Sequence, residues 1–254
     1  ITATEAIDAV AAAMRGVVTE PVSKGDVSRR VAATMDEPYL RFCRVCDAIH
    51  LYEMPFRLAA LRAGLELEPG TSPPVLRRIA DFRRADRADP RHDVVNGYLR
   101  LLGPATPKHV AEYLDAPVSD VKARWPDDLV EVNVEGETGW LPAAELPRLE
   151  GEPPDVTRLL APFDLFLQAR DRGLLVPDAG HAKTVWPRLG RPGGVLLDGD
   201  LAGVWRARKT GRSLRLTVDL WDRGTARAKR LLEEQAERLA AHRKVSLSGV
   251  DFTP

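Results

Sequence analysis

Between Asp89 and Pro142, apolar and polar positions alternate in a pattern that predicts three short helices followed by a β-hairpin. A first helical stripe is stopped by Gly103-Pro104, a pair that ends helices. Thr106-Pro107 then begins a second helix, because Thr is a favourable N-cap and Pro is tolerated in the first turn. The apolar positions of the three predicted helices are Val94, Val95, Tyr98, Leu99, Leu101, Leu102, Val110, Tyr113, Leu114, Val118, Val121 and Trp125.

After these helices the period changes to that of a half-buried strand. Val130, Val132 and Val134 alternate with polar residues, Glu135-Gly136-Glu137 forms a turn, and Trp140-Leu141 begins a return strand. Three helices and a hairpin in this order are typical of a winged helix, which we expect over residues 89–150. The architecture is common among DNA-binding proteins but does not by itself establish DNA binding.

The first part of the chain carries a similar pattern and predicts a winged-helix-like module over residues 1–82, joined to the next by a charged linker at 83–88. An Ala-rich amphipathic helix opens it, and Ser23-Lys24-Gly25-Asp26 resembles a capping box for a second helix. A third helix is expected from Glu37-Pro38 to Ile49. Arg41 and Arg44 lie on this third helix, where a recognition helix would present them to DNA. Solvated surface residues would have the same pattern.

Residues 151–254 have a different character. Short alternating runs before and after Asp198-Gly199-Asp200 and Thr210-Gly211 predict an antiparallel meander. An amphipathic helix is expected from Gly224 to His242, and Ser246 to Phe252 could return a last strand to the sheet. The predicted fold class is therefore α+β, with tandem winged helix-turn-helix modules followed by a small antiparallel β-meander domain that has a C-terminal helix.

The net charge is zero, which does not favour nucleic-acid binding, but the charges are segregated along the chain. Residues 201–254 hold 12 Lys/Arg against 6 Asp/Glu, whereas residues 127–155 hold 1 Arg against 9 Asp/Glu. The acidic wing around Glu131, Glu135 and Glu137 would repel phosphates, and the basic C-terminal part would attract them.

The best DNA-contact candidates are four basic residues of the C-terminal meander. Strand alternation puts Arg206 and Arg208 on one face, and Lys209 and Arg212 lie at the hairpin tip. Such a tip can follow phosphates or enter a groove. An edge strand protected by charges would have the same sequence. Trp205 is expected in the core on the opposite face.

Other function classes are less well supported. No apolar run approaches the roughly 20 residues of a membrane helix, and there is no basic leader of a signal peptide. Two cysteines indicate a reducing cytoplasm rather than a disulfide scaffold. Cys43, Cys46 and His50 are spaced i, i+3, i+7 on a predicted helix and could face a zinc ion. A structural zinc site needs a fourth ligand, however, and core-facing thiols explain the same spacing, so no metal is predicted.

Three segments of the C-terminal part carry a family resemblance: Leu-Ala-Pro-Phe-Asp at 160–164, Arg-Asp-Arg at 170–172, and Gly-Asp-Leu-Ala-Gly-Val-Trp-Arg-Ala-Arg-Lys at 199–209. Together with the order of modules, they resemble the AlkZ/YcaQ-like winged-helix DNA-binding proteins, a bacterial DNA glycosylase superfamily. The resemblance extends from about Ala6 to about Leu220. It implies double-stranded DNA as the partner and a role in DNA repair, because characterised members excise alkylated bases and unhook interstrand crosslinks.

Members of that family use a Gln-x-Gln or Gln-x-Asp motif in the first of three winged helices. This sequence has only Gln168 and Gln235, and neither is followed by the required residue. The chain begins at Ile1 without a Met, so we expect that an N-terminal segment with the catalytic module is missing, or else that the chemistry is absent. No catalytic residue is therefore assigned. Asp164 and Asp171 are the obvious carboxylates near a turn, and structural roles are expected for both.

The leading hypothesis is a winged-helix DNA-binding protein that resembles DNA-repair glycosylases acting on alkylated or crosslinked bases. It would be an enzyme only if a further module supplied the motif. A winged-helix transcriptional regulator and a protein-interaction module without DNA binding are the alternatives. We expect a cytoplasmic monomer without a small-molecule cofactor.

Overall fold

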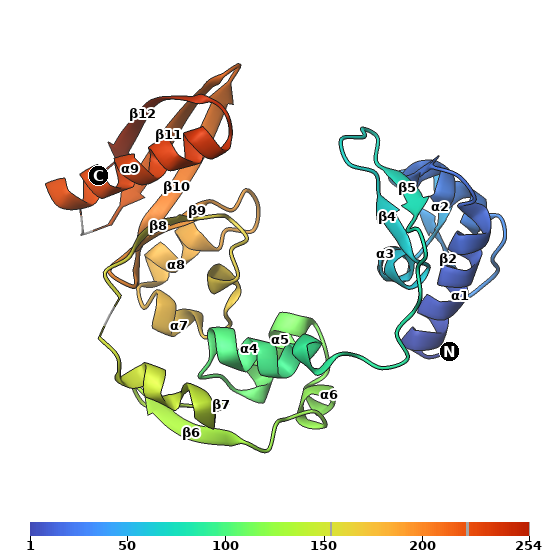
Figure 1. The fold of residues 1–254 in the computed structure, drawn as a ribbon, viewed down its shortest axis with the longest axis horizontal. Helices are drawn as coiled ribbons and strands as arrows, with labels where there is room; N and C mark the ends of the chain where they lie inside the picture. The colour runs from blue at the N-terminus through green and yellow to red at the C-terminus, as the bar shows by residue number, and fades with distance from the viewer. Residues whose placement is uncertain (153, 222–223, 254) are drawn as a thin grey trace. The chain divides into compact units, whose positions relative to one another are not determined.

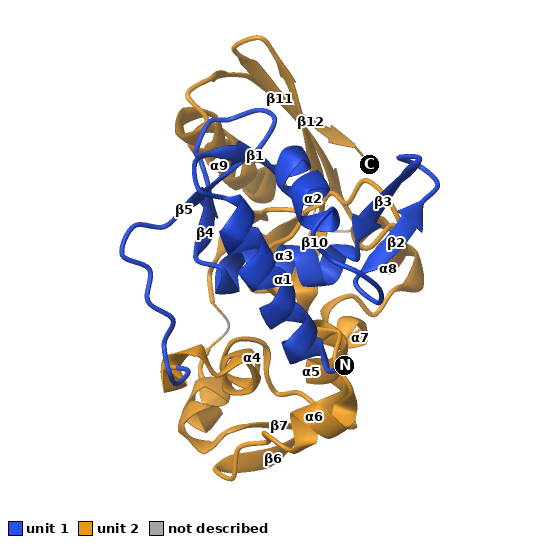
Figure 2. Ribbon diagram, turned by 90° about the vertical axis from the view of Figure 1, so that its right-hand side faces the viewer, with its two compact units in different colours: residues 1–88 blue, residues 89–254 orange. Residues whose placement is uncertain are grey.

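The computed structural model describes residues 1–152, 154–221 and 224–253. The chain forms two compact units, residues 1–88 and residues 89–254 (Figures 1 and 2). The fold is mixed α+β, with several small antiparallel sheets and a five-stranded sheet near the C-terminus. Among the described residues, no helix is long and apolar enough to cross a membrane.

The first unit is built around a three-stranded sheet of order β1-β5-β4, with a separate two-stranded hairpin formed by β2 and β3. Its elements are α1 (Ala3–Val17), β1 (Val22–Ser23), α2 (Lys24–Ala32), β2 (Leu40–Cys43), β3 (Ala48–Leu51), α3 (Glu53–Arg62), β4 (Leu65–Leu67) and β5 (Val75–Arg78). The three helices bury Met14, Val31 and Ala59 against Leu65 of the sheet. The Ser23 side chain accepts a hydrogen bond from the backbone N–H of Asp26, so the predicted N-cap of the second helix is confirmed.

The helix predicted from Glu37 to Ile49 is wrong, because this segment forms the β2–β3 hairpin. The third helix of the unit is α3, which begins only after the hairpin. Arg41 therefore lies on a strand and Arg44 in the turn, and neither is on a recognition helix. The physical reason is the turn at 44–47: Asp47 has a φ of 47°, which reverses the chain and allows Phe42 to pair with Ile49.

The second unit begins with the helices and hairpin that the sequence predicts. Its elements are η1 (Pro90–His92), α4 (Val94–Leu102), α5 (Pro107–Leu114), α6 (Val118–Lys122), β6 (Leu129–Val134), β7 (Glu137–Pro142) and η2 (Ala143–Glu150). Thr106 is the N-cap of α5 and accepts a hydrogen bond from the backbone N–H of His109. The turn at Glu135 and Gly136 has positive φ at both residues, which suits a two-residue hairpin loop. These local predictions are confirmed.

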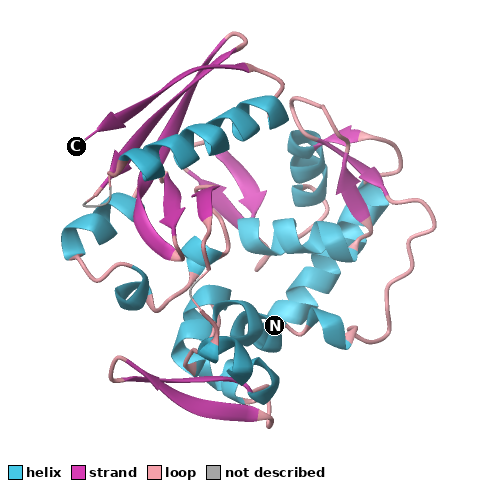
Figure 3. Cartoon of the chain, turned by 60° about the vertical axis from the view of Figure 1, so that its left-hand side comes forward, coloured by secondary structure: helices cyan, strands magenta, loops and turns pink. Residues whose placement is uncertain are grey.

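The rest of the second unit is a five-stranded sheet of order β12-β11-β10-β9-β8, with helices on both faces (Figure 3). Its elements are β8 (Thr157–Leu160), η3 (Phe166–Gln168), α7 (Arg172–Leu175), α8 (Ala179–Val185), β9 (Gly193–Leu197), β10 (Asp200–Thr210), β11 (Ser213–Leu220), α9 (Ala226–His242) and β12 (Ser246–Thr253). Leu232 and Ala236 of α9 pack on one face against Leu216. On the other face, Val185 of α8 belongs to the core cluster that includes Val204.

The sheet is not wholly antiparallel as predicted, because β12 pairs with β11 in parallel. Helix α9 has 17 residues and is about 25 Å long, so it carries the chain back to the end of the sheet where β11 begins. A parallel pair needs such a crossover, whereas a tight turn gives an antiparallel pair. The short helices α7 and α8 were also not predicted.

Glycine is required where β9 passes the base of the long hairpin. Trp205 is buried and donates a hydrogen bond from Nε1 to the Leu160 carbonyl oxygen at 2.8 Å. A Cβ on Gly193 would overlap both groups of this hydrogen bond. We therefore expect Gly193→Ala to lower the free energy of unfolding of the second unit by about 1–3 kcal/mol. Urea unfolding followed by tryptophan fluorescence measures this change.

Gly97→Ala is the matched control, because Gly97 lies inside α4 and a Cβ there would meet nothing within 4 Å. It should leave stability unchanged or raise it by up to about 1 kcal/mol through helix propensity. Equal effects of the two substitutions would contradict the packing argument.

Candidate nucleic-acid interface

The hairpin of β10 and β11 projects a row of basic side chains into solvent. All residues from Arg206 to Thr210 are exposed, whereas the preceding half of β10 is buried. Arg206 lies opposite Thr217, and Arg208 lies opposite Arg215. Residues two positions apart on one strand point to the same face, so Arg206 and Arg208 lie on one face as predicted.

The end of the hairpin differs in one respect from the prediction. The two-residue loop consists of Gly211, whose φ is 58°, and Arg212, so Arg212 is at the tip. Lys209 is still on the strand and lies opposite Leu214, on the other face from Arg208. Trp205 is buried on that other face, which confirms its predicted core position.

Two arginines of the hairpin have protein partners. Arg206 donates a hydrogen bond from its guanidinium to the Gly190 carbonyl oxygen at 2.7 Å. Arg215 forms an ion pair with Asp251 at 2.9 Å, which partly neutralises its charge. The Arg206 contact joins the base of the hairpin to the loop that precedes β9, and the next residue of this loop is Arg191.

Sequence reasoning missed a second basic group, formed by Arg170, Arg172 and Arg191. The Arg172 guanidinium lies 4.9 Å from the ring centroid of Trp186, and the Arg191 guanidinium lies 5.6 Å from that of Phe163. Burial lowers the pKa of Arg172, and the positive charges of Arg170 and Arg191 lower it further. Three like charges therefore share one partly buried corner of the second unit.

Several donors in this corner have no acceptor. The Nε atoms of Arg170 and Arg172 and the Nε2 atom of Gln168 are buried without a hydrogen-bond partner among the described residues. Arg191 does donate to the Gln168 Oε1 atom, at 3.3 Å. Unpaired buried donors beside concentrated positive charge favour binding of an anion, because an anion satisfies the donors and offsets the repulsion.

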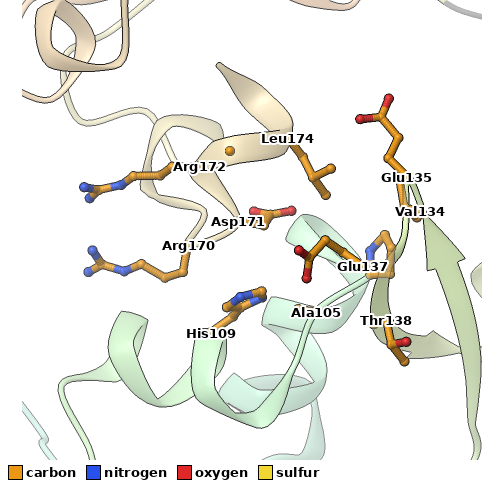
Figure 4. Close-up of a pocket in the computed structure, with 13 residues that line it drawn as sticks. Ala105, His109, Val134, Glu135, Glu137, Thr138, Arg170, Asp171, Arg172 and Leu174 are labelled. Carbon is orange, nitrogen blue, oxygen red and sulfur yellow. The ribbon is translucent and has the colours of Figure 1, made fainter. Parts of the chain in front are cut away.

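A cavity of about 410 Å³ lies next to this corner, between the β6–β7 hairpin, α5 and the start of α7. Figure 4 shows Asp171 near Glu137 and His109, while Arg170 and Arg172 extend to the left of the view. Burial raises the pKa of the Asp171 carboxyl, and a hydrogen bond from its own backbone N–H opposes this shift. The cavity is thus lined by acidic groups and also by Arg170 and Arg172.

The two carboxylates that sequence analysis singled out have different surroundings. Asp164 accepts a hydrogen bond from the Phe166 backbone N–H at 3.0 Å, so its predicted role in the turn is confirmed. Asp171 occupies the N-cap of α7 but makes no side-chain cap hydrogen bond. Its Oδ1 atom is buried without a partner among the described residues, so the structural role expected for Asp171 stays a prediction.

In the first unit, the β2–β3 hairpin brings together three metal-ligating side chains. The ligand atoms of Cys43, Cys46 and His50 all lie within 4.8 Å of one another. Cys46 is exposed and Cys43 is half-buried, so the interpretation of both as core-facing thiols is wrong. The backbone N–H groups of Cys46 and Val45 lower the pKa of the Cys43 thiol. Arg41 and Arg44 are both exposed on this hairpin.

The family model for AlkZ-like DNA glycosylases matches residues 1–242. The chain belongs to the AlkZ-like DNA glycosylase family. Its fold is similar to that of Streptomyces sahachiroi DNA glycosylase AlkZ, with a TM-score of 0.67 and 20% sequence identity. That similarity covers 97% of this chain and 69% of the AlkZ chain. A search of curated proteins gives no significant match.

The raised pKa of Asp171 makes a testable prediction about stability and pH. A group with a raised pKa in the folded state favours folding below its unfolded pKa, and this contribution is lost as pH rises through the folded value. At pH 7 burial of the Asp171 carboxyl therefore disfavours folding, and Asp171→Asn should raise the melting temperature. The difference in melting temperature between the variant and the native chain should shrink below about pH 4, where the Asp171 carboxyl is protonated in both the folded and the unfolded state.

Asp178→Asn is the control of opposite sign, because the His181 backbone N–H lowers the pKa of Asp178. Its contribution to stability is present at neutral pH and is lost on acidification, so this variant should melt lower than the native chain at pH 7. Differential scanning fluorimetry from pH 3 to pH 8 compares the two. A lower melting temperature for Asp171→Asn at pH 7 would contradict the assignment.

Proposed function

We propose that this chain binds duplex DNA along a basic strip made of Arg170, Arg172, Arg191, Arg206, Arg208 and Arg212, with Lys209 on the other face of the hairpin as a further phosphate contact. The observation that carries the proposal is the unpaired donors of Arg170 and Arg172 beside a third arginine. DNA presents a regular row of phosphates, and a planar guanidinium can hold a phosphate through two parallel hydrogen bonds. A duplex would therefore supply the acceptors that this corner lacks.

Successive members of the strip are related by electrostatic interaction, by a hydrogen bond or by their positions on one strand. Arg172 lies in the field of Arg191, and the residue before Arg191 accepts the hydrogen bond of Arg206. Arg208 follows on the same strand face as Arg206 and leads to Arg212 at the tip. Val204, two residues before Arg206, packs on the sheet face that carries α7 and α8, so the arginine face of the hairpin lies on the same side.

Each unit also contains a winged helix under this proposal. In the first unit, α1, α2, α3 and the sheet β1-β5-β4 have the order of a winged helix, with the β2–β3 hairpin inserted between α2 and α3. Arg41 and Arg44 on that insertion are further candidate phosphate contacts. The β6–β7 wing of the second unit carries exposed Glu131 and Glu137, so we assign no DNA contact to it.

The biological role that best fits is DNA repair, because the family is one of DNA glycosylases. Alkylated or crosslinked bases are the proposed targets. A glycosylase engages damaged duplex as a monomer, whereas a transcriptional regulator dimerises and prefers one sequence, so binding assays on mixed sequences separate the two. Reduced cysteines and the DNA substrate agree with a cytoplasmic location.

The first prediction from the proposal concerns salt dependence. Replacing Arg206, Arg208, Lys209 and Arg212 with Ala should weaken binding to all duplex sequences alike, because phosphate contacts do not distinguish bases. Each lost contact should reduce the slope of log K against log salt by about 0.9. Fluorescence anisotropy with a labelled duplex at several salt concentrations measures both quantities.

The matched control removes the same charge from helix α9 on the opposite face of the sheet. Arg227, Arg230 and Arg238 on this helix and Arg243 directly after it are all exposed, and their replacement with Ala should leave the salt slope unchanged. Unaltered affinity and slope in the hairpin variant would refute the strip. Equal losses in both variants would show that net charge alone governs binding.

A second prediction concerns chemistry. Base excision must stabilise a positively charged sugar and position a water molecule, and the two glutamines of this chain are 67 positions apart. The purified 254-residue chain should therefore bind duplex DNA that contains an alkylated base without releasing that base. Mass spectrometry of the released bases measures excision. Release that is abolished by Asp164→Asn or Asp171→Asn would place an active site in the second unit and contradict this prediction.

A further inference from the structure

The β2–β3 hairpin buries few apolar side chains against the rest of the first unit. Its two strands form a sheet of their own and, within the described parts of the chain, pair with no other strand. Phe42, Val45 and Ile49 are exposed, Val45 almost fully at 95%. Among the described residues, the buried Leu51 and the half-buried Leu40 anchor the base of the hairpin to the core. An isolated two-stranded hairpin is marginally stable in water, so a further constraint near the tip would stabilise it.

The tip carries the sequence Cys43-Arg44-Val45-Cys46, and His50 follows on the return strand. Cys43 lies opposite Ala48, and His50 is two residues further along β3, so Cys43 and His50 share one face. The small Ala48 leaves space between them. Cys46 is in the turn, and the left-handed conformation of Asp47 starts the chain back along β3. This geometry brings two sulfur atoms and an imidazole nitrogen to one point.

The distances suit a tetrahedral zinc ion. Zinc–sulfur bonds of about 2.3 Å and zinc–nitrogen bonds of about 2.0 Å place tetrahedral ligand atoms roughly 3.5–3.8 Å apart. The three ligand atoms here lie within 4.8 Å of one another, so movements of about 1 Å complete the arrangement.

We propose that Cys43, Cys46 and His50 bind one zinc ion, with a water molecule as the fourth ligand. On binding, both thiols release their protons to solvent, and the two thiolates neutralise the charge of Zn²⁺. The fourth position faces a cavity of about 370 Å³, which is also lined by Ser28, Glu53 and Phe56. Glu53 forms an ion pair with Arg57 at 2.6 Å, so its carboxylate is already engaged.

This site has a structural role in the proposal. The ion would fasten the tip of the hairpin and thereby fix the positions of Arg41 and Arg44 on either side of Cys43. The prediction of no metal rests on a helical placement of the three residues and on the need for a fourth protein ligand. The three residues lie on a hairpin rather than on a helix, and the adjacent cavity leaves room for a water molecule as the fourth ligand. The inference does not depend on DNA binding.

Metal content of the purified chain tests the proposal. After dialysis against micromolar zinc and removal of the excess, mass spectrometry should find one zinc ion per chain. Cobalt(II) should bind in its place and give the visible absorption of tetrahedral cobalt together with a thiolate charge-transfer band. Chelation of the zinc should lower the melting temperature of the native chain, since binding energy is folding energy at such a site.

Cys46→Ser and His50→Gln should lose most of the bound zinc and the cobalt spectrum. His242→Gln, an exposed histidine on α9, is the control and should retain both. The cobalt titration of the native chain tests the proposal even if a variant fails to fold. A native chain that remains metal-free with two titratable thiols would overturn the site, and so would a metal-free chain with a Cys43–Cys46 disulfide.

Discussion

The stretch from Leu167 to Arg172 joins the two hydrophobic cores of the second unit, and the arrangement of the basic strip depends on it. Leu167 is buried in the core beneath the five-stranded sheet, while Ala169 is buried in the core of helices α4 to α6. The Arg170 backbone N–H then donates a hydrogen bond to the Tyr98 hydroxyl at 3.1 Å. These contacts hold the backbone up to Arg170, so they place Arg170 and Arg172 close together despite their like charges.

That constraint explains why polar atoms remain unpaired here. Side chains on a free loop would turn towards water, but Arg170, Asp171 and Arg172 each keep a buried atom without a partner among the described residues. Unpaired buried groups cost stability, and they are retained where a ligand supplies the missing partner. The acidic β6–β7 wing lies on the other side of the cavity, so a polyanion is directed towards the arginines and the projecting hairpin.

Elements defined by local signals could be predicted from the sequence. Gly103-Pro104, Thr106-Pro107 and Glu135-Gly136 each fix a boundary within a few residues, and the apolar pattern between them agrees with burial. The β2–β3 hairpin could not be predicted, because its twelve residues also satisfy a helical spacing and the chain reversal depends on the left-handed conformation of one residue, Asp47. The parallel orientation of β12 follows from a helical crossover, which strand alternation does not report.

Only part of the basic strip could be predicted, because one group of its arginines is local in the sequence and the other is assembled by tertiary packing. Arg206, Arg208 and Arg212 are neighbours along one hairpin, so their common position follows from strand alternation and a turn. The cluster of Arg170, Arg172 and Arg191 is assembled by tertiary packing across about 20 residues of chain. In the sequence, Asp171 lies between two arginines and lowers the local net charge, so the excess of positive charge is not apparent there. Only the fold shows that Trp186 and Phe163 lie beside these guanidinium groups.

The central claim is that phosphates satisfy the unpaired arginine donors of the second unit. Nitrogen-15 NMR of the arginine Nε–H groups during titration with a short mixed-sequence duplex observes these donors directly. The account predicts that the Arg170, Arg172 and Arg206 signals shift and become protected from exchange with water, while the arginines of α9 change little. Shifts confined to α9, or no change at Arg170 and Arg172 when DNA is bound, would contradict it.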